Sequence, residues 1–493
     1  MLYPAELTGR GALLIRRAPD GARRFQPGDR GISCGPSLRW GGLTSLASEG
    51  RSLTGHQWSA VVASFLGWTL DAFDFFLMVF MFSAIAQEFH AKVAAVAIAS
   101  TLTLAARPFG ALVFGMLADR FGRRTVLMVD ILLYSALEFA SAFAPTLAVL
   151  FLLRAAFGFA MGGEWGVGAA LAMESIPPKA RGFISGLLQE GYAAGYLLAS
   201  VVFFLLFDRI GWRGMFMVGL VPALLVVLLR LGVQESPVFQ ARPPPTVKRS
   251  PLFLLVIGLG ALAVALAPAL AGAKDSASML RWVYFVDGPI AFLGLWAFRE
   301  HWKMALYVVA LMTAFNFFSH GTQDLFPTFL QKEHRLDTHT VGVLAVIMNL
   351  GAIIGGITFG AWSERIGRRR AMAIAALASL AILPIWAFSH TVAMLAAGAF
   401  AMQFMVQGAW GVIPAHLNEL SPADARGAFP GYAYQLGNLL ASGNAVWQAQ
   451  IAEARGDDYS LALALVAGIV AVAIAALTML GPERRDVDFA AET

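Results

Sequence analysis

The chain has 493 residues, of which 58% are hydrophobic and only 14% are charged, and its formal net charge is +5. A water-soluble protein carries roughly a quarter of its residues as charged side chains, so this composition excludes a soluble globular protein and predicts an all-α integral membrane protein. The Arg and Lys residues stand in short clusters between apolar runs, which indicates membrane topology and argues against nucleic acid as a partner.

Residues 1–56 differ from the rest of the chain. They carry eight arginines and many glycines but contain no apolar run long enough to span a bilayer. The basic residues do not directly precede an apolar stretch, so this is not the pattern of a signal peptide. We expect a disordered basic cytoplasmic tail; the alternative is that the true start of the chain lies downstream.

Apolar runs of about 20 residues, the length of a spanning helix, recur from residue 57 to residue 480. About fourteen stretches qualify, and in chain order they are 57–84, 93–118, 125–144, 147–174, 182–207, 212–231, 252–272, 280–298, 303–330, 340–362, 371–389, 391–417, 427–450 and 459–480. The stretch 280–298 is the weakest because it contains Asp287 and Pro289.

Basic clusters alternate in step with these stretches. They lie at Asp119–Arg124, Lys179–Arg181, Arg242–Arg249, Arg299–Lys303, Glu364–Arg370 and Arg484–Arg485. Because positively charged loops face the cytoplasm, the pattern predicts a multi-pass protein of the inner (plasma) membrane of the cell, with both termini cytoplasmic. We expect it to work in the lipid bilayer as a monomer.

An internal repeat divides the chain. The sequence GMLADRFGRR begins at Gly115 and recurs as GAWSERIGRR from Gly360, 245 residues later. A second block, 163–182, recurs with the same offset at 408–427, which pairs Trp165 with Trp410. We therefore expect two related six-helix bundles separated by an unpaired insertion. The predicted divisions are 57–231 for the N-terminal bundle, 232–302 for a basic linker with two extra transmembrane helices, 303–480 for the C-terminal bundle and 481–493 for a cytoplasmic tail.

The repeated loop pattern resembles the motif between helices two and three of the major facilitator superfamily, whose fold consists of two parallel six-helix repeats. Acidic and basic side chains at this loop can pair at the cytoplasmic face and separate when the halves move. We expect a gating role for Asp119, Arg120, Arg123, Arg124, Glu364, Arg365, Arg368 and Arg369. The alternative is a role in topology alone, since basic loops orient any membrane protein.

Charges inside spanning helices indicate function, because each costs roughly 2.5–3.5 kcal/mol at mid-bilayer. Arg107 precedes Asp119 by twelve residues, which places it roughly 18 Å from the cytoplasmic boundary, near the midplane. A guanidinium at that depth suits a carboxylate substrate. The alternative is a structural ion pair with Asp71, Asp74 or Glu138.

Asp71 and Asp74 are three residues apart and share one helical face. Buried carboxyl groups of this kind can carry protons, as can Glu138, although neutralising nearby arginines is the competing interpretation. In the stretch 303–330, His320 lies one turn from Asp324. Such a pair could relay protons or simply form a polar patch between the halves.

Asn316, Ser319, His320, Thr322, Gln323, Asp324 and Thr328 match the helix-seven motif of the Jen-type lactate/pyruvate–proton symporters. This resemblance covers roughly residues 57–480 and extends to the branch that includes the sialic acid–proton symporters. It implies substrate binding by Arg107, Asn316, Gln323 and Gln435, and proton coupling by His320 and Asp324. The predicted extra pair 252–298 is similar to the bacterial sialate symporters and absent from the fungal lactate carriers.

We therefore predict a proton-coupled symporter that imports a carboxylate, lactate or pyruvate above others, by alternating access. The alternatives are a symporter for sialic acid or an aromatic acid, a proton-driven efflux antiporter, and a receptor that binds without transport. No metal-ligand spacing, nucleotide-binding motif or catalytic nucleophile motif occurs in the sequence. We expect no enzymatic activity, no metal and no cofactor, with the proton gradient as the energy source.

Overall fold

The structure is a computed structural model that describes residues 53–91, 93–241, 260, 281, 284–285, 288–456, 458–485 and 487–489. Residues 44–493 form one compact unit. Every regular element within the described ranges is a helix, as the composition predicts. The predicted stretch 252–272 and parts of the tail 1–56 and of 280–298 fall outside these ranges.

Helices of the first half follow the predicted stretches closely. They are α2 (Gly55–Phe80), α3 (Phe82–Glu88), α4 (Val93–Phe121), α5 (Arg123–Ser141), α6 (Leu147–Met161), α7 (Glu164–Ser175), η1 (Pro178–Ala180), α8 (Arg181–Gln189), α9 (Gly191–Leu231) and α10 (Pro237–Ala241). The Thr54 hydroxyl accepts the Gln57 amide at 3.3 Å and so caps α2. Within α9, Gly211 has φ 60°, a conformation that glycine adopts most easily, and it separates the predicted spans 182–207 and 212–231.

The remaining elements begin with α13 (Gly288–Leu293) and η3 (Gly294–His301), which lie in the predicted insertion 232–302. They continue with α14 (Trp302–Gln323), α15 (Phe326–Lys332), α16 (Thr338–Ile366), α17 (Arg368–Phe388), α18 (Val392–Trp410), α19 (Ile413–Leu420), η4 (Ala423–Ala425), α20 (Phe429–Ala441), α21 (Asn444–Ala454) and α22 (Tyr459–Leu480). From α14 on, the second half repeats the order of the first. Nine helical stretches within the described ranges are long and apolar enough to cross a membrane. The count of about fourteen and the six-two-six division remain predictions.

Polarity is inverted relative to a soluble protein. Large apolar side chains lie on the outside, among them Val221 at 67% and Ile469 at 68% exposure, whereas Asp74, Glu138 and Arg154 are almost completely buried. Such a surface fits lipid, and the buried charges point to the interior path.

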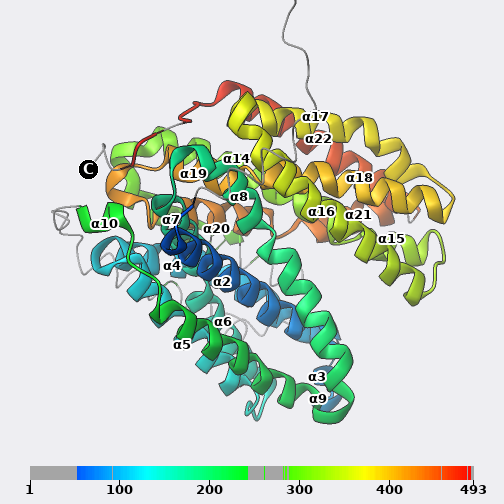
Figure 1. Cartoon of the computed structure of the whole chain (residues 1–493). Helices are drawn as coiled ribbons and strands as arrows, with labels where there is room; N and C mark the ends of the chain where they lie inside the picture. The colour runs from blue at the N-terminus through cyan, green and yellow to red at the C-terminus, as the bar shows by residue number, and fades with distance from the viewer. Residues whose placement is uncertain are drawn as a thin grey trace, which may run out of the picture. The chain divides into compact units, whose positions relative to one another are not determined.

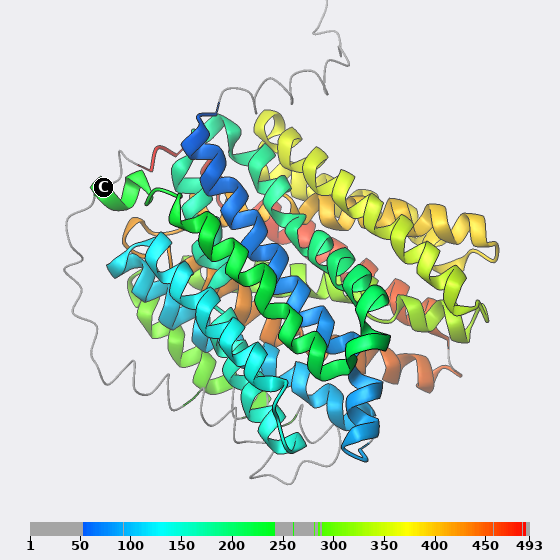
Figure 2. The ribbon, with the colours of Figure 1, turned by 60° about the horizontal axis from the view of Figure 1, so that its bottom comes forward.

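The two halves meet at one end of the molecule. There α8 packs against α16 and α4 packs against α20, and Figures 1 and 2 show the helices of each half running apart from this region. Glycines make the close contact possible: a Cβ on Gly186 would lie 2.4 Å from the carbonyl oxygen of Gly356. We call this end, which carries the loop motif of each half, the arginine-rich end.

Candidate functional site

The first loop motif forms a buried ion cluster at the arginine-rich end. Arg123 begins α5 and has no exposed surface. Its guanidinium lies 2.9 Å from Asp119 and 3.1 Å from Glu174. Glu235 accepts the backbone amides of Arg123 and Arg124 at 3.0 and 3.1 Å. Three carboxylates thus surround the start of α5, where the helix dipole also favours negative charge.

The second half builds a matching cluster, in which Glu364, Arg368 and Glu419 stand 245 positions after Asp119, Arg123 and Glu174, and Glu483 takes the place of Glu235. Arg368 lies 3.0 Å from Glu364 and 2.9 Å from Glu419. Glu483 accepts the backbone amides of Arg368 and Arg369 at 2.9 and 3.1 Å. The repeat therefore extends from sequence to individual ion pairs.

Each cluster also holds the opposite half. Asp119 accepts the backbone amides of Gly427 and Ala428 at 2.9 and 3.2 Å, and Glu364 accepts the amide of Gly182. The acidic residue of each motif is therefore hydrogen-bonded across the interface.

The other arginines predicted for gating make different contacts, mostly within their own half. Arg124 donates to the carbonyl of Leu231 at 2.7 Å, and Arg369 donates to that of Thr478 at 2.6 Å. Arg120 lies against the Phe121 ring, and Arg365 is exposed.

Arg107 lies in the core of the first half, 4% exposed, and pairs with Asp71 of α2. Its Nη2 donates to Asp71 Oδ1 at 2.9 Å, whereas its Nε has no hydrogen-bond partner among the described residues. The break between α6 and α7 lies beside it, since a Cβ on Gly162 would be 2.2 Å from the Arg107 carbonyl oxygen. Of the candidate partners of Arg107, the structure selects Asp71.

A second buried cluster contains Asp74, Glu138 and Arg154. Arg154 donates to Glu138 at 2.5 Å and to Ser141 at 2.6 Å. Neither carboxylate oxygen of Asp74 has a hydrogen-bond partner within the described ranges. Two carboxyl groups therefore share one arginine, and an unpaired buried charge would be costly. The cluster is close to neutral when one of the two carboxyl groups carries a proton.

The polar face of α14 points toward α20 and α18. His320 Nδ1 is 3.2 Å from Asp324, and its Nε2 is 3.2 Å from the side-chain oxygen of Asn438. Their side chains are 29% (His320) and 37% (Asp324) exposed. The predicted His–Asp pair therefore exists, on a partly open surface.

Of the other predicted binding residues of the second half, Asn316 and Gln435 are buried and Gln323 is partly buried. Gln323 donates to Gln403 of α18 at 2.8 Å, and Asn316 donates to the carbonyl of Met312 at 2.8 Å. Gln435 of α20 is 1% exposed, and neither polar atom of its amide has a partner within the described part of the chain. An unsatisfied buried amide is unusual and indicates a site for a ligand or water.

Aromatic side chains join the two halves at this level. Tyr192 stacks on Trp68 with a centroid distance of 5.7 Å, and Trp165 contacts Tyr434 of α20 at 4.6 Å. The guanidinium carbon of Arg107 lies 5.7 Å from the centroid of the Phe75 ring, and Phe75 contacts Tyr192 through Phe76. Arg107 therefore borders this aromatic layer.

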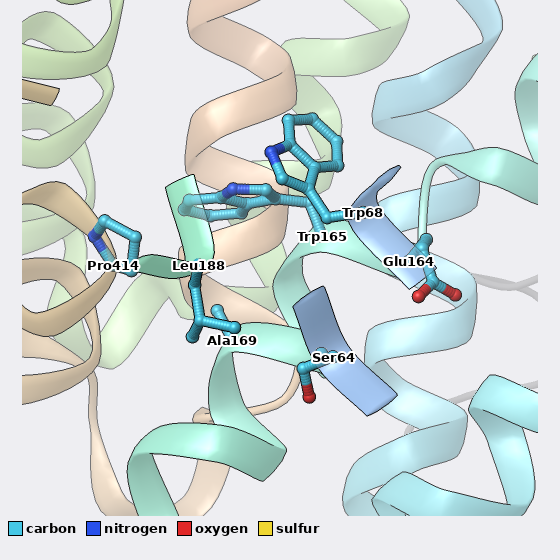
Figure 3. A pocket seen from close by; sticks show the side chains of 8 residues that line it. Ser64, Trp68, Glu164, Trp165, Ala169, Leu188 and Pro414 are labelled. Atoms are coloured by element: carbon cyan, nitrogen blue, oxygen red, sulfur yellow. The ribbon is translucent and has the colours of Figure 1, made fainter. Parts of the chain in front are cut away.

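A small pocket lies next to this layer. It is lined by Ser64, Trp68, Glu164, Trp165, Gly168, Ala169, Leu188 and Pro414, and Figure 3 shows how the labelled side chains surround it. The Ser64 hydroxyl and the Trp68 indole nitrogen are buried without hydrogen-bond partners in the described ranges. The space is large enough for about one water molecule, which could satisfy these two polar groups.

Sequence reasoning missed several of these residues. Tyr192, Tyr434, Gln403 and Glu190 were not among the candidates. The repeat offers a signal for one of them, since Glu190 precedes Gln435 by the same 245 positions. No such spacing marks Tyr192.

Two family models match the chain: Major Facilitator Superfamily at residues 60–258 and Sugar (and other) transporter at residues 301–484. The chain is 29% identical over 450 residues to a carboxylic acid transporter protein homolog of Saccharomyces cerevisiae, covering 88% of this chain and 70% of that protein. It is 26% identical over 384 residues to the sialic acid transporter NanX of Escherichia coli, covering 77% and 84%.

Among solved structures, the proton:xylose symporter XylE superposes with a TM-score of 0.66 at 17% identity, covering 87% of this chain and 97% of that one. The likeness supports the helical architecture described above and, at this identity, concerns the fold alone.

Proposed function

We propose that the protein, which belongs to the major facilitator superfamily of membrane transporters, is a proton-coupled symporter that imports a carboxylate by alternating access. The family consists of transporters and not of enzymes. The proposed substrates are short monocarboxylates such as lactate and pyruvate, in line with the helix-seven motif from Asn316 to Thr328.

The observation that carries the proposal is the ion pair between Arg107 and Asp71. Both side chains are buried, and their Nη2–Oδ1 distance is 2.9 Å. A guanidinium offers five donors in a planar fork that fits a carboxylate, yet Asp71 occupies only one terminal nitrogen. Arg107 is therefore suited to bind a second carboxylate, that of the substrate.

Protonation of Asp71 would couple the binding of the proton to the binding of the substrate carboxylate. While Asp71 is ionised, it neutralises Arg107 and competes with the substrate for the guanidinium. Once Asp71 takes up a proton, Arg107 becomes available to the anion, and the site remains electrically neutral with both ligands bound. Proton and carboxylate then favour each other's binding, which is the thermodynamic requirement of symport.

In this proposal His320 and Asp324 receive the proton from outside. Their pair is partly exposed and reaches Asn438 of α20, and the histidine ring can transfer a proton between its two nitrogens. Asp74 and Glu138, which share Arg154, form a second proton-binding cluster deeper in the first half. Gln435, Gln323 and Asn316 would contribute hydrogen bonds to the substrate.

Alternating access would use the arginine-rich end as the inner gate. By the positive-inside rule we assign this end to the cytoplasmic side, and we propose that the protein lies in the inner (plasma) membrane with both termini inside. The bonds from Asp119 and Glu364 across the halves then hold the inner gate closed, and the conformation faces outward. Breaking them would open the path to the cytoplasm.

A larger acid such as sialic acid is a second candidate substrate. It is supported by the similarity to the sialic acid transporter NanX. The unpartnered amide of Gln435 could bind the extra hydroxyl groups of such a substrate.

Uptake into proteoliposomes tests the proposal. With an imposed proton gradient, acid outside, we expect labelled lactate to accumulate above its equilibrium level and the gradient to dissipate with it. A parallel assay with sialate distinguishes the two substrates. Arg107→Lys should lower apparent affinity about tenfold or more, because Lys lacks the planar fork. Expulsion of substrate by the gradient would instead indicate an antiporter, and binding without flux a receptor.

A further inference from the structure

Glu190 lies at the junction of α8 and α9, between the two halves. Arg181, which begins α8, stands at the arginine-rich end, and Glu190 follows it by nine residues, roughly 13 Å along the helix axis. This depth is within the hydrophobic core of a bilayer. The side chain is 5% exposed.

The Glu190 carboxyl group points across the interface at α16. A Cβ added to Gly356 would lie only 2.0 Å from Glu190 Oε1, so the glycine leaves just enough room for the carboxyl group. Gly356 also contacts Gly186, one turn before Glu190, through its carbonyl oxygen. The Glu190 side chain therefore fills the α8–α16 interface when the two helices are in contact.

No charged group compensates Glu190 there. The same Cβ position on Gly356 would lie 3.4 Å from the backbone carbonyl oxygen of Gln407 in α18, so this carbonyl borders the same space. From α2, Phe65, Trp68 and Thr69 contact the neighbouring Gly191. Among the described residues no Asp, Glu, Lys, Arg or His interacts electrostatically with this carboxyl group, and its Oε1 has no hydrogen-bond partner. An isolated buried carboxylate would cost far more than a neutral acid.

We propose that Glu190 carries a proton while the α8–α16 interface is closed and releases it to the cytoplasmic side when the interface opens. This rests on the alternating access proposed above and adds a proton-sensitive residue of the inner gate, outside the substrate site. In the closed state the neutral acid fits between the helices. In the open state water reaches the carboxyl group, which then ionises in the ordinary range of glutamate.

The proposal predicts that the inner gate responds to cytoplasmic pH. At pH values above the ordinary pKa of glutamate, each further pH unit should raise the ratio of open to closed protein by up to about tenfold, since opening releases one proton. Protonation of Glu190 from the cytoplasm would close the gate again. The repeat counterpart Gln435 has no titratable group, so the response is confined to one of the two equivalent positions.

Pulsed EPR distances across the arginine-rich end test this. Spin labels are placed at Lys179→Cys and Arg370→Cys, both exposed and in different halves, in a Cys34→Ser background without substrate or proton gradient. From about pH 5 to about pH 8, the open population should rise in the parent and in the control Glu300→Gln, which alters an exposed glutamate. The quantity compared is the slope of the logarithm of the open-to-closed ratio against pH. In Glu190→Gln this slope should fall by the equivalent of about one proton, and the closed state should dominate.

An unchanged slope in Glu190→Gln would overturn the proposal. Glu190→Asp retains a carboxyl group and should retain a pH-dependent slope. Loss of the slope in this variant would contradict the proposal even if the glutamine variant did not fold. Because the measurement uses neither a carboxylate nor a gradient, its failure leaves the symport proposal standing. Conversely, an intact Glu190 slope with no carboxylate uptake would refute only the proposed substrate and coupling.

Discussion

The guanidinium carbon of Arg181 lies 3.5 Å from the ring centroid of Phe489. Arg426, the repeat counterpart of Arg181, stacks on the same ring at 4.2 Å. Phe489 is 1% exposed, and Arg181 also donates to the Val487 carbonyl at 2.7 Å. The C-terminal segment, predicted as a simple cytoplasmic tail, thus connects the two halves at the arginine-rich end.

We therefore expect Phe489→Ala to destabilise the closed inner gate. Buried cation–π contacts contribute about 2 kcal/mol, so the ratio of open to closed protein, measured with the same 179–370 label pair, should rise by up to about thirtyfold. Phe489→Trp retains an aromatic face and serves as the control. Equal distance distributions in the alanine variant and the parent would exclude a gating role for the segment.

The acidic residue of each loop motif should stabilise the closed state. Asp119→Asn and Glu364→Gln retain size but weaken the bonds to the amides of the opposite half, and hydrogen bonds to charged groups contribute about 1.5–3 kcal/mol. We expect each variant to shift the protein toward the inward-open state and to reduce uptake. Asp424→Asn, an exposed change nearby, should leave the distribution unchanged. If Asp119→Asn and Glu364→Gln also leave the distance distribution unchanged, the repeated motif acts only in topology.

Proton coupling through His320 and Asp324 predicts a separation of two activities. Asp324→Asn preserves hydrogen bonding but removes the titratable group next to His320. Gradient-driven accumulation should be lost, whereas exchange of labelled for unlabelled substrate should persist. Asp337→Asn alters a carboxylate at the start of α16 and should retain accumulation. If Asp324→Asn still concentrates substrate, the proton is carried elsewhere, with Asp71, Asp74 and Glu138 as the next candidates.

At the end opposite the arginine-rich end, Glu88 connects α3 to α9. Hydrogen bonding from Arg213 holds the pKa of Glu88 below its ordinary value of 4.5. A carboxyl group whose pKa is lower in the folded state stabilises that state above its unfolded pKa, and this contribution is lost as the pH falls through the folded pKa. Glu88→Gln should therefore lower the melting temperature slightly at neutral pH, because exposed pairs contribute about 0.2–1 kcal/mol. The difference from wild type should disappear near pH 3; a constant difference would exclude an ionic origin.

The sequence predicts those features that the repeat and hydropathy encode. The helix boundaries around Arg123 and Arg368, and their equivalent acidic neighbours, follow from apolar length and the 245-residue spacing. The partner of Arg107 could not be predicted, because Asp71, Asp74 and Glu138 are equivalent by composition and only packing selects Asp71. Tyr192 was missed because its contacts with Trp68 and Phe76 depend on packing that no spacing indicates. Glu190 has a signal in the 245-residue spacing to Gln435, but its burial against α16 of the opposite half is visible only in the structure.

Proton uptake on substrate binding tests the central claim, that Arg107 exchanges Asp71 for the carboxylate of the substrate. Purified protein in weakly buffered solution above pH 7 is mixed with lactate, and a pH indicator records the protons taken up. The wild type should take up about one proton per bound anion, whereas Asp71→Asn should bind lactate with little or none. Binding by the wild type without proton uptake, or equal uptake by Asp71→Asn, would contradict the claim.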